Sequence, residues 1–223
     1  MTTPRFHPPQ QHRSQETLDR ILDATEGVLE SKSFTDATLA EIMERAGMTV
    51  GAFYRRFPDK DALLQHMDER FFGEVRQRGD DLLDPPRWSG ASASDVVHAF
   101  TAEAVSIYRA RRGLLRSLFL RARNDQVLQI SASRVNEHLL ERLRAVLLPR
   151  AHEMRHPEPA RAIDLGYMVM IGALRETTLF DETWPKPTPA DAVDLADELA
   201  RLLLGYLGAP IGESLTSASG VKR

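Results

Sequence analysis

Side chains of the types that can bind phosphate groups and bases lie close together between residues 38 and 60. Tyr54, Arg55 and Arg56 are consecutive, and Lys60 follows four residues later. Hydroxyl, guanidinium and ammonium groups donate hydrogen bonds to phosphate oxygens, and arginine also binds guanine bidentately. The chemistry that this segment offers is therefore recognition of a polyanion and not turnover of a substrate.

Two short helices joined by a tight turn are expected to position these groups. Thr38 with Glu41 three residues later is a capping box, so a helix begins there and carries a buried stripe. Gly47 is suited to end that helix, and Thr49 to begin the next. Such a pair is typical of the DNA-binding helix-turn-helix. The residues that we expect to contact DNA are Thr38, Thr49, Val50, Gly51, Tyr54, Arg55, Arg56 and Lys60.

The segment from Ser14 to Phe71 resembles the N-terminal domain of the TetR family of bacterial transcriptional regulators. The matching residues are Ala46, Gly47, Ala52, Phe53, Tyr54, Phe57, Asp59 and Lys60. The resemblance implies an all-α homodimer that binds a double-stranded DNA operator, most often as a repressor. It also implies a C-terminal body that binds a small-molecule effector and releases the DNA.

The individual roles expected at the DNA differ. Tyr54 would meet a phosphate, and Arg55 and Arg56 would reach bases or phosphates. The resemblance places Lys60 on the DNA backbone. Val50 departs from the polar residue common at its position in the family, so reading there would be apolar, for example of a thymine methyl group.

Net charge alone does not favour nucleic acid. The chain carries a formal charge of −3, and residues 1–70 hold nine lysines and arginines against twelve acidic residues. Several acidic residues belong to the first predicted helix, which need not face DNA. The local field at the contact face matters more than the total charge of the domain.

Composition bounds the remaining possibilities. The chain has 223 residues and no cysteine, so neither disulfides nor thiolate-bound metals are available. No apolar run approaches the length of a membrane span, and the start of the chain has no apolar signal segment. We expect a cytoplasmic protein without a cofactor or a metal ion.

Hydrophobic periodicity predicts an all-α fold of about nine helices. We expect a flexible arm over residues 1–13, a helix-turn-helix domain of three helices over 14–70, a helical effector-binding and dimerisation domain over 71–208, and a disordered tail over 209–223. Besides the two short helices of the motif, which begin at Thr38 and Thr49, the predicted helices are 14–31, 59–83, 95–110, 113–123, 125–148, 159–181 and 190–207.

The last two predicted helices favour a homodimer. The eighth is apolar around nearly its whole circumference, and such a helix must be covered on several sides.

The body also holds more aromatic surface than a spacer needs. The candidate effector-binding residues are Phe100, Tyr108, Phe119, Tyr167 and Met170. A solid core filled by the same side chains is an equally valid reading.

One motif points to a different chemistry. The segment from His152 to His156 matches H-E-x-x-H, the pattern of zinc hydrolases. Pro149 and Pro157 bracket it, and proline disfavours helical geometry at the residue before it. We therefore expect a loop between helices here. A helical scaffold that only binds other proteins is the other alternative class.

Overall fold

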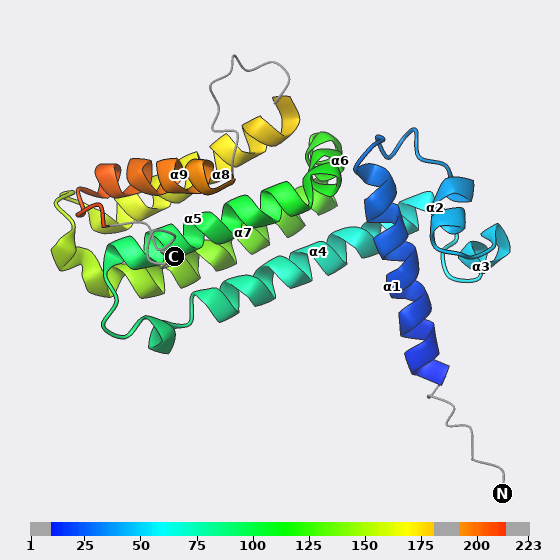
Figure 1. Ribbon diagram of the computed structural model, residues 1–223, viewed down its shortest axis with the longest axis horizontal. Coiled ribbons are helices and arrows are strands. Elements are labelled where there is room, and N and C mark those ends of the chain that lie inside the picture. The colour runs from blue at the N-terminus through cyan, green and yellow to red at the C-terminus, as the bar shows by residue number, and fades with distance from the viewer. Residues whose placement is uncertain (1–9, 181–191, 213–223) are drawn as a thin grey trace, which may run out of the picture. The chain divides into compact units, whose positions relative to one another are not determined.

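The computed structural model describes residues 10–180 and 192–212, and every regular element in these ranges is a helix. None of the helices described is both long enough and apolar enough to cross a membrane. Contacts divide the chain into two compact units, Met1–Arg70 and Phe71–Arg223, and one helix, α4 (Lys60–Leu82), contributes residues to both (Figure 1). The prediction of an all-α fold is confirmed.

The N-terminal unit contains α1 (Gln10–Leu29), α2 (Leu39–Arg45), α3 (Val50–Tyr54) and the first part of α4. Its fully buried side chains come from all four helices and from the residues after α3. The largest are Ile21, Ile42, Met43, Phe53, Phe57, Leu63 and Met67. α1 begins at Gln10, four residues before the predicted start, so only residues 1–9 of the predicted arm lie outside the described residues.

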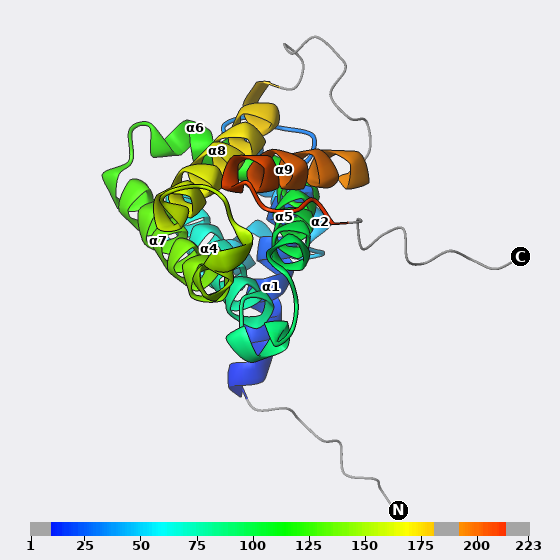
Figure 2. The same cartoon turned by 90° about the vertical axis from the view of Figure 1, so that its left-hand side faces the viewer.

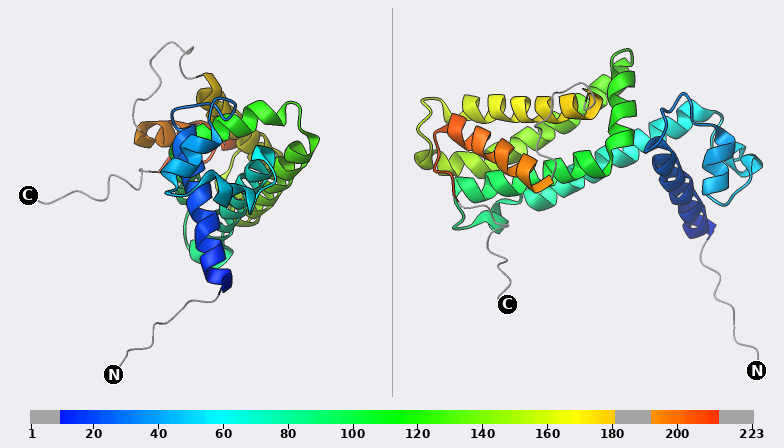
Figure 3. Two further views of the ribbon diagram at one scale, coloured as in Figure 1. Left: turned by 90° about the vertical axis from the view of Figure 1, so that its right-hand side faces the viewer. Right: turned by 45° about the horizontal axis from the view of Figure 1, so that its top comes forward.

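The C-terminal unit is built from the remainder of α4 and from α5 (Ala93–Ala110), α6 (Arg112–Ala122), α7 (Gln126–Leu147), α8 (Pro159–Phe180) and α9 (Ala192–Leu207). α4, α5 and α7 run side by side, and α9 packs against α5 and α8 (Figures 1 and 2). α6 runs across the end of this bundle (Figure 3). The fourth to ninth helices begin and end within two residues of the predicted positions.

Two segments expected to be irregular form short 3-10 helices, η1 (Pro85–Trp88) and η2 (Leu148–Glu153). The indole Nε1 of Trp88 donates to the carbonyl of Leu82 at 2.7 Å and folds η1 back onto the end of α4. Arg150 of η2 donates to the carbonyls of Ala91 (2.8 Å) and Trp88. These long-range bonds order both segments, and sequence periodicity carries no information about them.

Candidate nucleic-acid interface and effector cavity

The turn between α2 and α3 has a defined geometry. Gly47 takes the left-handed conformation with φ of 66°, which a side chain would strain. Its N–H donates to the carbonyl of Glu44 at 2.9 Å, and the Met48 N–H donates to the carbonyl of Met43 at 2.8 Å. This pair of bonds is a Schellman motif. The guanidinium of Arg20 on α1 donates to the Ala46 carbonyl at 2.6 Å and holds the turn against α1.

Both short helices are capped by threonine. The Thr38 hydroxyl accepts from the Glu41 N–H at 3.2 Å, and the Glu41 carboxylate accepts from the Thr38 N–H at 2.9 Å. Hydrogen bonds from Lys32 and Thr38 lower the pKa of Glu41 to about 2. The Thr49 hydroxyl accepts from the Ala52 N–H at 3.3 Å at the start of α3. Thr38 and Thr49 are exposed, so each cap also lies at the surface.

One face of α3 is open to solvent, whereas the other belongs to the core. Val50 is 39% exposed and Tyr54, one turn later, is 59% exposed, and Gly51 and Arg55 are exposed as well. Phe53 is fully buried and contacts the ring of Phe57 at a centroid distance of 5.3 Å. A five-residue helix is thus anchored by one aromatic pair and presents its other side chains outward.

Arg56 and Lys60 have partners inside the N-terminal unit. Arg56 Nη2 donates to the Ser14 hydroxyl of α1 at 3.0 Å. The Lys60 ammonium donates to the carbonyls of Phe34 and Ala37 and lies 4.2 Å from the centroid of the Phe34 ring. Partial burial lowers the pKa of Lys60. An ammonium group has three N–H donors, so one of them remains for an external acceptor.

Part of the acidic charge of this unit is neutralised internally. Arg70 of α4 pairs with Asp23 of α1 at 2.7 Å and also with Glu26. Burial lowers the pKa of Arg70, but the hydrogen bonds with these two carboxylates outweigh that effect and raise it. Lys32 pairs with Glu41. These pairs leave the net charge of the unit unchanged, because the arginine and the lysine are already counted among its basic residues.

The C-terminal unit contains a partly open cavity of about 680 Å³ between α4, α5, α6, α7 and α8. Four of the five aromatic and apolar residues proposed for the effector site line it, namely Phe100, Tyr108, Phe119 and Tyr167. Phe100 and Tyr167 stack with ring centroids 6.0 Å apart, and Tyr108 and Phe119 lie 6.1 Å apart. Met170, the fifth, is 2% exposed and belongs to the core, outside the lining.

Sequence reasoning did not name the part of the lining that comes from α4. Phe71, Phe72, Val75 and Leu82 all face the cavity. Helical spacing indicates a buried stripe through Phe71 and Val75, but not whether that stripe meets packed side chains or empty space, and it does not indicate Phe72 or Leu82. The polar members Asn136 and Arg175 were also missed, because nothing in their local sequence separates them from solvated residues.

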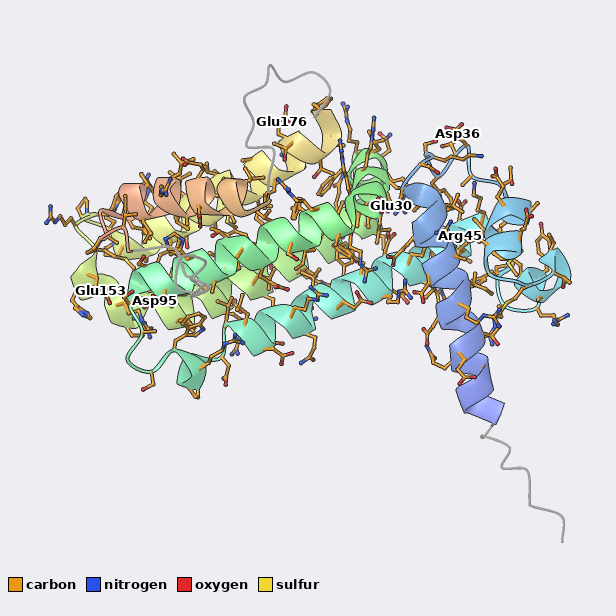
Figure 4. The ribbon with its side chains drawn as sticks, viewed as in Figure 1. Glu30, Asp36, Arg45, Asp95, Glu153 and Glu176 are labelled. Carbon is orange, nitrogen blue, oxygen red and sulfur yellow. The ribbon has the colours of Figure 1, made fainter. Side chains whose placement is uncertain are left out.

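The H-E-x-x-H segment does not form a helix that would direct both histidines to one side. His152 and Glu153 belong to η2, which ends at Glu153. The Glu153 carboxylate accepts from the Ala93 N–H at 2.9 Å and so holds the start of α5, near Asp95 (Figure 4). The ring of His156 contacts that of Tyr206 at 5.1 Å. Among the residues described, no group of three His, Asp or Glu side chains is placed to hold a metal ion. Nothing in this geometry supports a zinc hydrolase.

An apolar surface lies on the outer sides of α8 and α9. Leu165, Met168 and Val169 of α8 are 38%, 61% and 58% exposed. On α9, Leu202 is 68% exposed and Tyr206 42%. We call these five residues the α8–α9 face. Gly172 also points into open space, since a Cβ atom built on it would meet nothing within 4 Å.

Comparisons with known proteins agree with this architecture. Residues 21–67 match the family model described as bacterial regulatory proteins, tetR family. A 68-residue segment is 32% identical to the HTH-type transcriptional regulator YdgC of Bacillus subtilis (strain 168), and the match covers 30% of this chain and 35% of that relative.

Similarity of fold extends over most of the chain. The transcriptional regulator FadR of Bacillus subtilis, solved in complex with stearoyl-CoA, superposes with a TM-score of 0.61 at 18% identity, covering 84% of this chain and 98% of FadR. SmeT, the repressor of the Stenotrophomonas maltophilia multidrug efflux pump SmeDEF, superposes with a TM-score of 0.59 at 19% identity, covering 89% of this chain and 96% of SmeT.

Proposed function

We propose that this chain, which belongs to the TetR family of bacterial regulatory proteins, is a dimeric repressor that a small molecule releases from a near-palindromic operator. The observation that carries the proposal is the exposed face of α3, with Val50, Tyr54 and Arg55 displayed on a helix that Phe53 anchors in the core. A helix held in this way enters the major groove as a rigid body, because its position is set by packing and not by the DNA.

The residues around α3 divide into base-reading and backbone-positioning roles. Arg55 is exposed and has no side-chain partner in the described part of the chain, so its guanidinium is available to a base edge. Val50 offers an apolar contact one turn before Tyr54, whose hydroxyl suits a phosphate. Thr38, Thr49 and Lys60 lie at helix starts, where N–H groups and the helix dipole favour phosphate. Gly51 keeps the approach to DNA free of side-chain atoms.

Substitution of Arg55 tests the reading role directly. We expect Arg55→Ala to weaken operator binding by roughly 1–3 kcal/mol and to relax preference at one position in each half-site. The measurement is selection of bound duplexes from a random library, followed by titration of the selected operator at several salt concentrations. An unchanged sequence preference would indicate that Arg55 contacts the DNA backbone and not the bases. Absence of salt-dependent binding to any duplex would favour the alternative of a helical scaffold.

Dimerisation through α8 and α9 is supported by the exposed α8–α9 face. Large apolar side chains gathered on one surface mark an interaction site. A two-fold axis beside α8 and α9 would bury this face against its own copy in a four-helix bundle. Two symmetric reading units then require an operator with two related half-sites.

Control by a ligand is supported by the cavity and by α4. A largely apolar space of about 680 Å³ is in the range of small-molecule sites, about 300–1,000 Å³. α4 provides Phe71, Phe72 and Val75 to its wall and Lys60 to the N-terminal unit. If a ligand binds more tightly to a conformation in which α4 is displaced, it shifts the equilibrium away from the DNA-bound conformation. FadR was solved with stearoyl-CoA, and SmeT is a repressor.

The regulatory proposal is tested by isolating genomic fragments that the protein retains and mapping the protected bases. Apolar and amphipathic metabolites are then screened for release of the labelled fragment. We expect protection of a near-palindrome close to a promoter and release by at least one class of compound. If the folded protein bound operator but no compound released it, ligand control would be abandoned and DNA binding retained.

A further inference from the structure

The cavity in the C-terminal unit has walls that are apolar but not uniformly so. Phe71, Phe72, Phe100, Phe119 and Tyr167 contribute aromatic rings from α4, α5, α6 and α8. Such walls bind hydrocarbon or ring surface and give no preference for any functional group. The chemical class of the ligand is therefore decided by the few polar groups that open onto this space.

Two polar side chains of the lining, Asn136 and Tyr108, have hydrogen-bond donors to offer, whereas Gln129 and Ser133 donate to the Ala122 carbonyl and to Glu137 and keep acceptor lone pairs. The Tyr167 hydroxyl donates to Asn136 Oδ1 at 2.9 Å, which leaves the two amide N–H donors of Asn136 without an acceptor among the described residues. The Tyr108 hydroxyl lines the same cavity and has no partner in residues 10–180 or 192–212. Burial raises the pKa of Tyr108 to about 12, against the opposing positive charge of Arg175, so the hydroxyl keeps its proton at neutral pH.

The charged groups of the lining are two arginines with no partner, one free carboxylate and one closed pair. Arg78 and Glu103 pair with each other at 3.0 Å. Arg123, at the end of α6, and Arg175, on α8, line the cavity with no ion-pair or hydrogen-bond partner within the described ranges. Glu176 is likewise unpaired and lies in the last turns of α8 (Figure 4). We call Arg123, Arg175 and Glu176 the rim of the cavity. The Arg78–Glu103 pair adds no net charge, so the rim gives the lining one net positive charge.

We propose that the effector is an organic monoanion with a large apolar body, its carboxylate bound by Arg175 and the Tyr108 hydroxyl. A guanidinium binds carboxylate through charge-assisted, often bidentate, hydrogen bonds. Tyr108 adds a neutral donor to the same oxygen atoms, and the aromatic walls cover the body of the ligand. Arg123 attracts the anion to the rim, while Glu176 disfavours a second negative charge. A cationic amphipath meets the net positive charge of the rim.

This inference rests on the proposed effector role of the cavity, and its test is a binding measurement made without DNA. The probes are pairs that differ only in the head group. 1-Pyrenebutanoate and 1-pyrenebutanol share a ring body, and their binding is followed by pyrene fluorescence. Dodecanoate, dodecan-1-ol and dodecylamine share a chain body, and each is measured by its displacement of bound pyrene probe. The two series distinguish ring-shaped from chain-shaped anions.

Four variants assign the effect to the cavity. Arg175→Gln removes the charge, and Arg175→Lys keeps it but loses the bidentate geometry. Tyr108→Phe removes only the hydroxyl. Arg116→Gln is the matched control, because Arg116 is an exposed arginine of α6 outside the lining. Far-ultraviolet circular dichroism of each variant establishes that the helices are intact.

We expect the wild-type protein to bind each acid at least about tenfold more tightly than its alcohol. The carboxylate accepts a charge-assisted hydrogen bond from Arg175, which the neutral alcohol does not. Arg175→Gln should remove most of this difference and leave alcohol binding within about twofold, and Arg175→Lys should restore part of it. Tyr108→Phe should reduce acid binding by a smaller factor, and Arg116→Gln should match the wild type.

The proposal is overturned if acids and alcohols bind equally, if dodecylamine binds more tightly than dodecanoate, if Arg175→Gln weakens both head groups alike, or if no probe binds. Release of operator DNA is measured separately. Acids that bind as expected while the operator stays bound would support the ligand class and contradict ligand control of DNA binding. The two proposals therefore fail in different experiments.

Discussion

Lys60 has a place in the fold as well as a predicted place on DNA. Its ammonium joins the carbonyls of Phe34 and Ala37, which lie in the segment between α1 and α2, to the start of α4. The same amine is expected to bind a phosphate with its remaining N–H. A substitution at this position therefore has two effects, and they are separated by measuring stability and salt dependence independently.

We expect Lys60→Ala to weaken binding to operator and to random DNA by similar factors. The slope of log K against log salt concentration should fall by about one, because one phosphate contact is lost. Binding is measured by fluorescence anisotropy between low and moderate salt. Lys60→Arg, which keeps the charge, should retain the slope. An unchanged slope in Lys60→Ala would restrict Lys60 to its structural role.

At the scale of the element, α2 depends on a capping box whose carboxylate is held charged. Hydrogen bonds from Lys32 and Thr38 set the pKa of Glu41 to about 2, below its ordinary value of 4.5. The contribution of Glu41 to stability is thus present in full above about pH 4.5 and is lost as the pH falls toward 2.

Glu41→Ala should consequently lower the urea midpoint of unfolding at pH 7, and the difference from the wild type should shrink between about pH 4.5 and pH 2. The matched control is Glu44→Ala, since Glu44 is exposed on the same helix and its side chain has no partner among the described residues. That variant should show little change at either pH. If the urea midpoint of Glu41→Ala lay as far below that of the wild type at pH 2 as at pH 7, the charge of Glu41 would not be what stabilises α2.

At the scale of the whole molecule, the α8–α9 face should control assembly. We expect Met168→Asp or Leu202→Asp to raise the dimer dissociation constant on the order of a hundredfold, because a carboxylate would be buried against apolar side chains. Sedimentation velocity over a range of concentrations measures it. Operator affinity should fall in parallel, since each monomer of the proposed dimer would read one half-site.

Val127→Asp is the control for this prediction. Val127 is 75% exposed on α7, away from the α8–α9 face, so the substitution adds the same charge without entering the proposed interface. Gly172→Leu belongs to the same test, and not to the cavity, because its side chain would enter open space beside this face. A monomeric wild-type protein, or equal effects of Val127→Asp and Met168→Asp, would contradict assembly through α8 and α9.

The sequence by itself determined the features that depend on neighbouring residues. Helix starts at Thr38 and Thr49, the left-handed glycine at position 47 and the inward Phe53 all follow from bonds or spacing within about one helical turn. The eighth helix was recognised from a long apolar segment and the ninth from the spacing of its apolar residues. Local hydrogen bonds and side-chain periodicity depend only on the types and order of neighbouring residues.

Only the tertiary structure decided how distant groups meet. Met170 and Tyr167 of α8 both belong to the core of the C-terminal unit, yet only Tyr167 also lines the cavity, and its hydroxyl reaches Asn136 of α7. The bonds of Lys60 to Phe34 and Ala37, and the position of Arg175 at the rim beside Tyr108, likewise depend on segments far apart in the chain. The cavity and the exposed apolar surfaces result from the packing of several helices, so the sequence of one helix does not predict them.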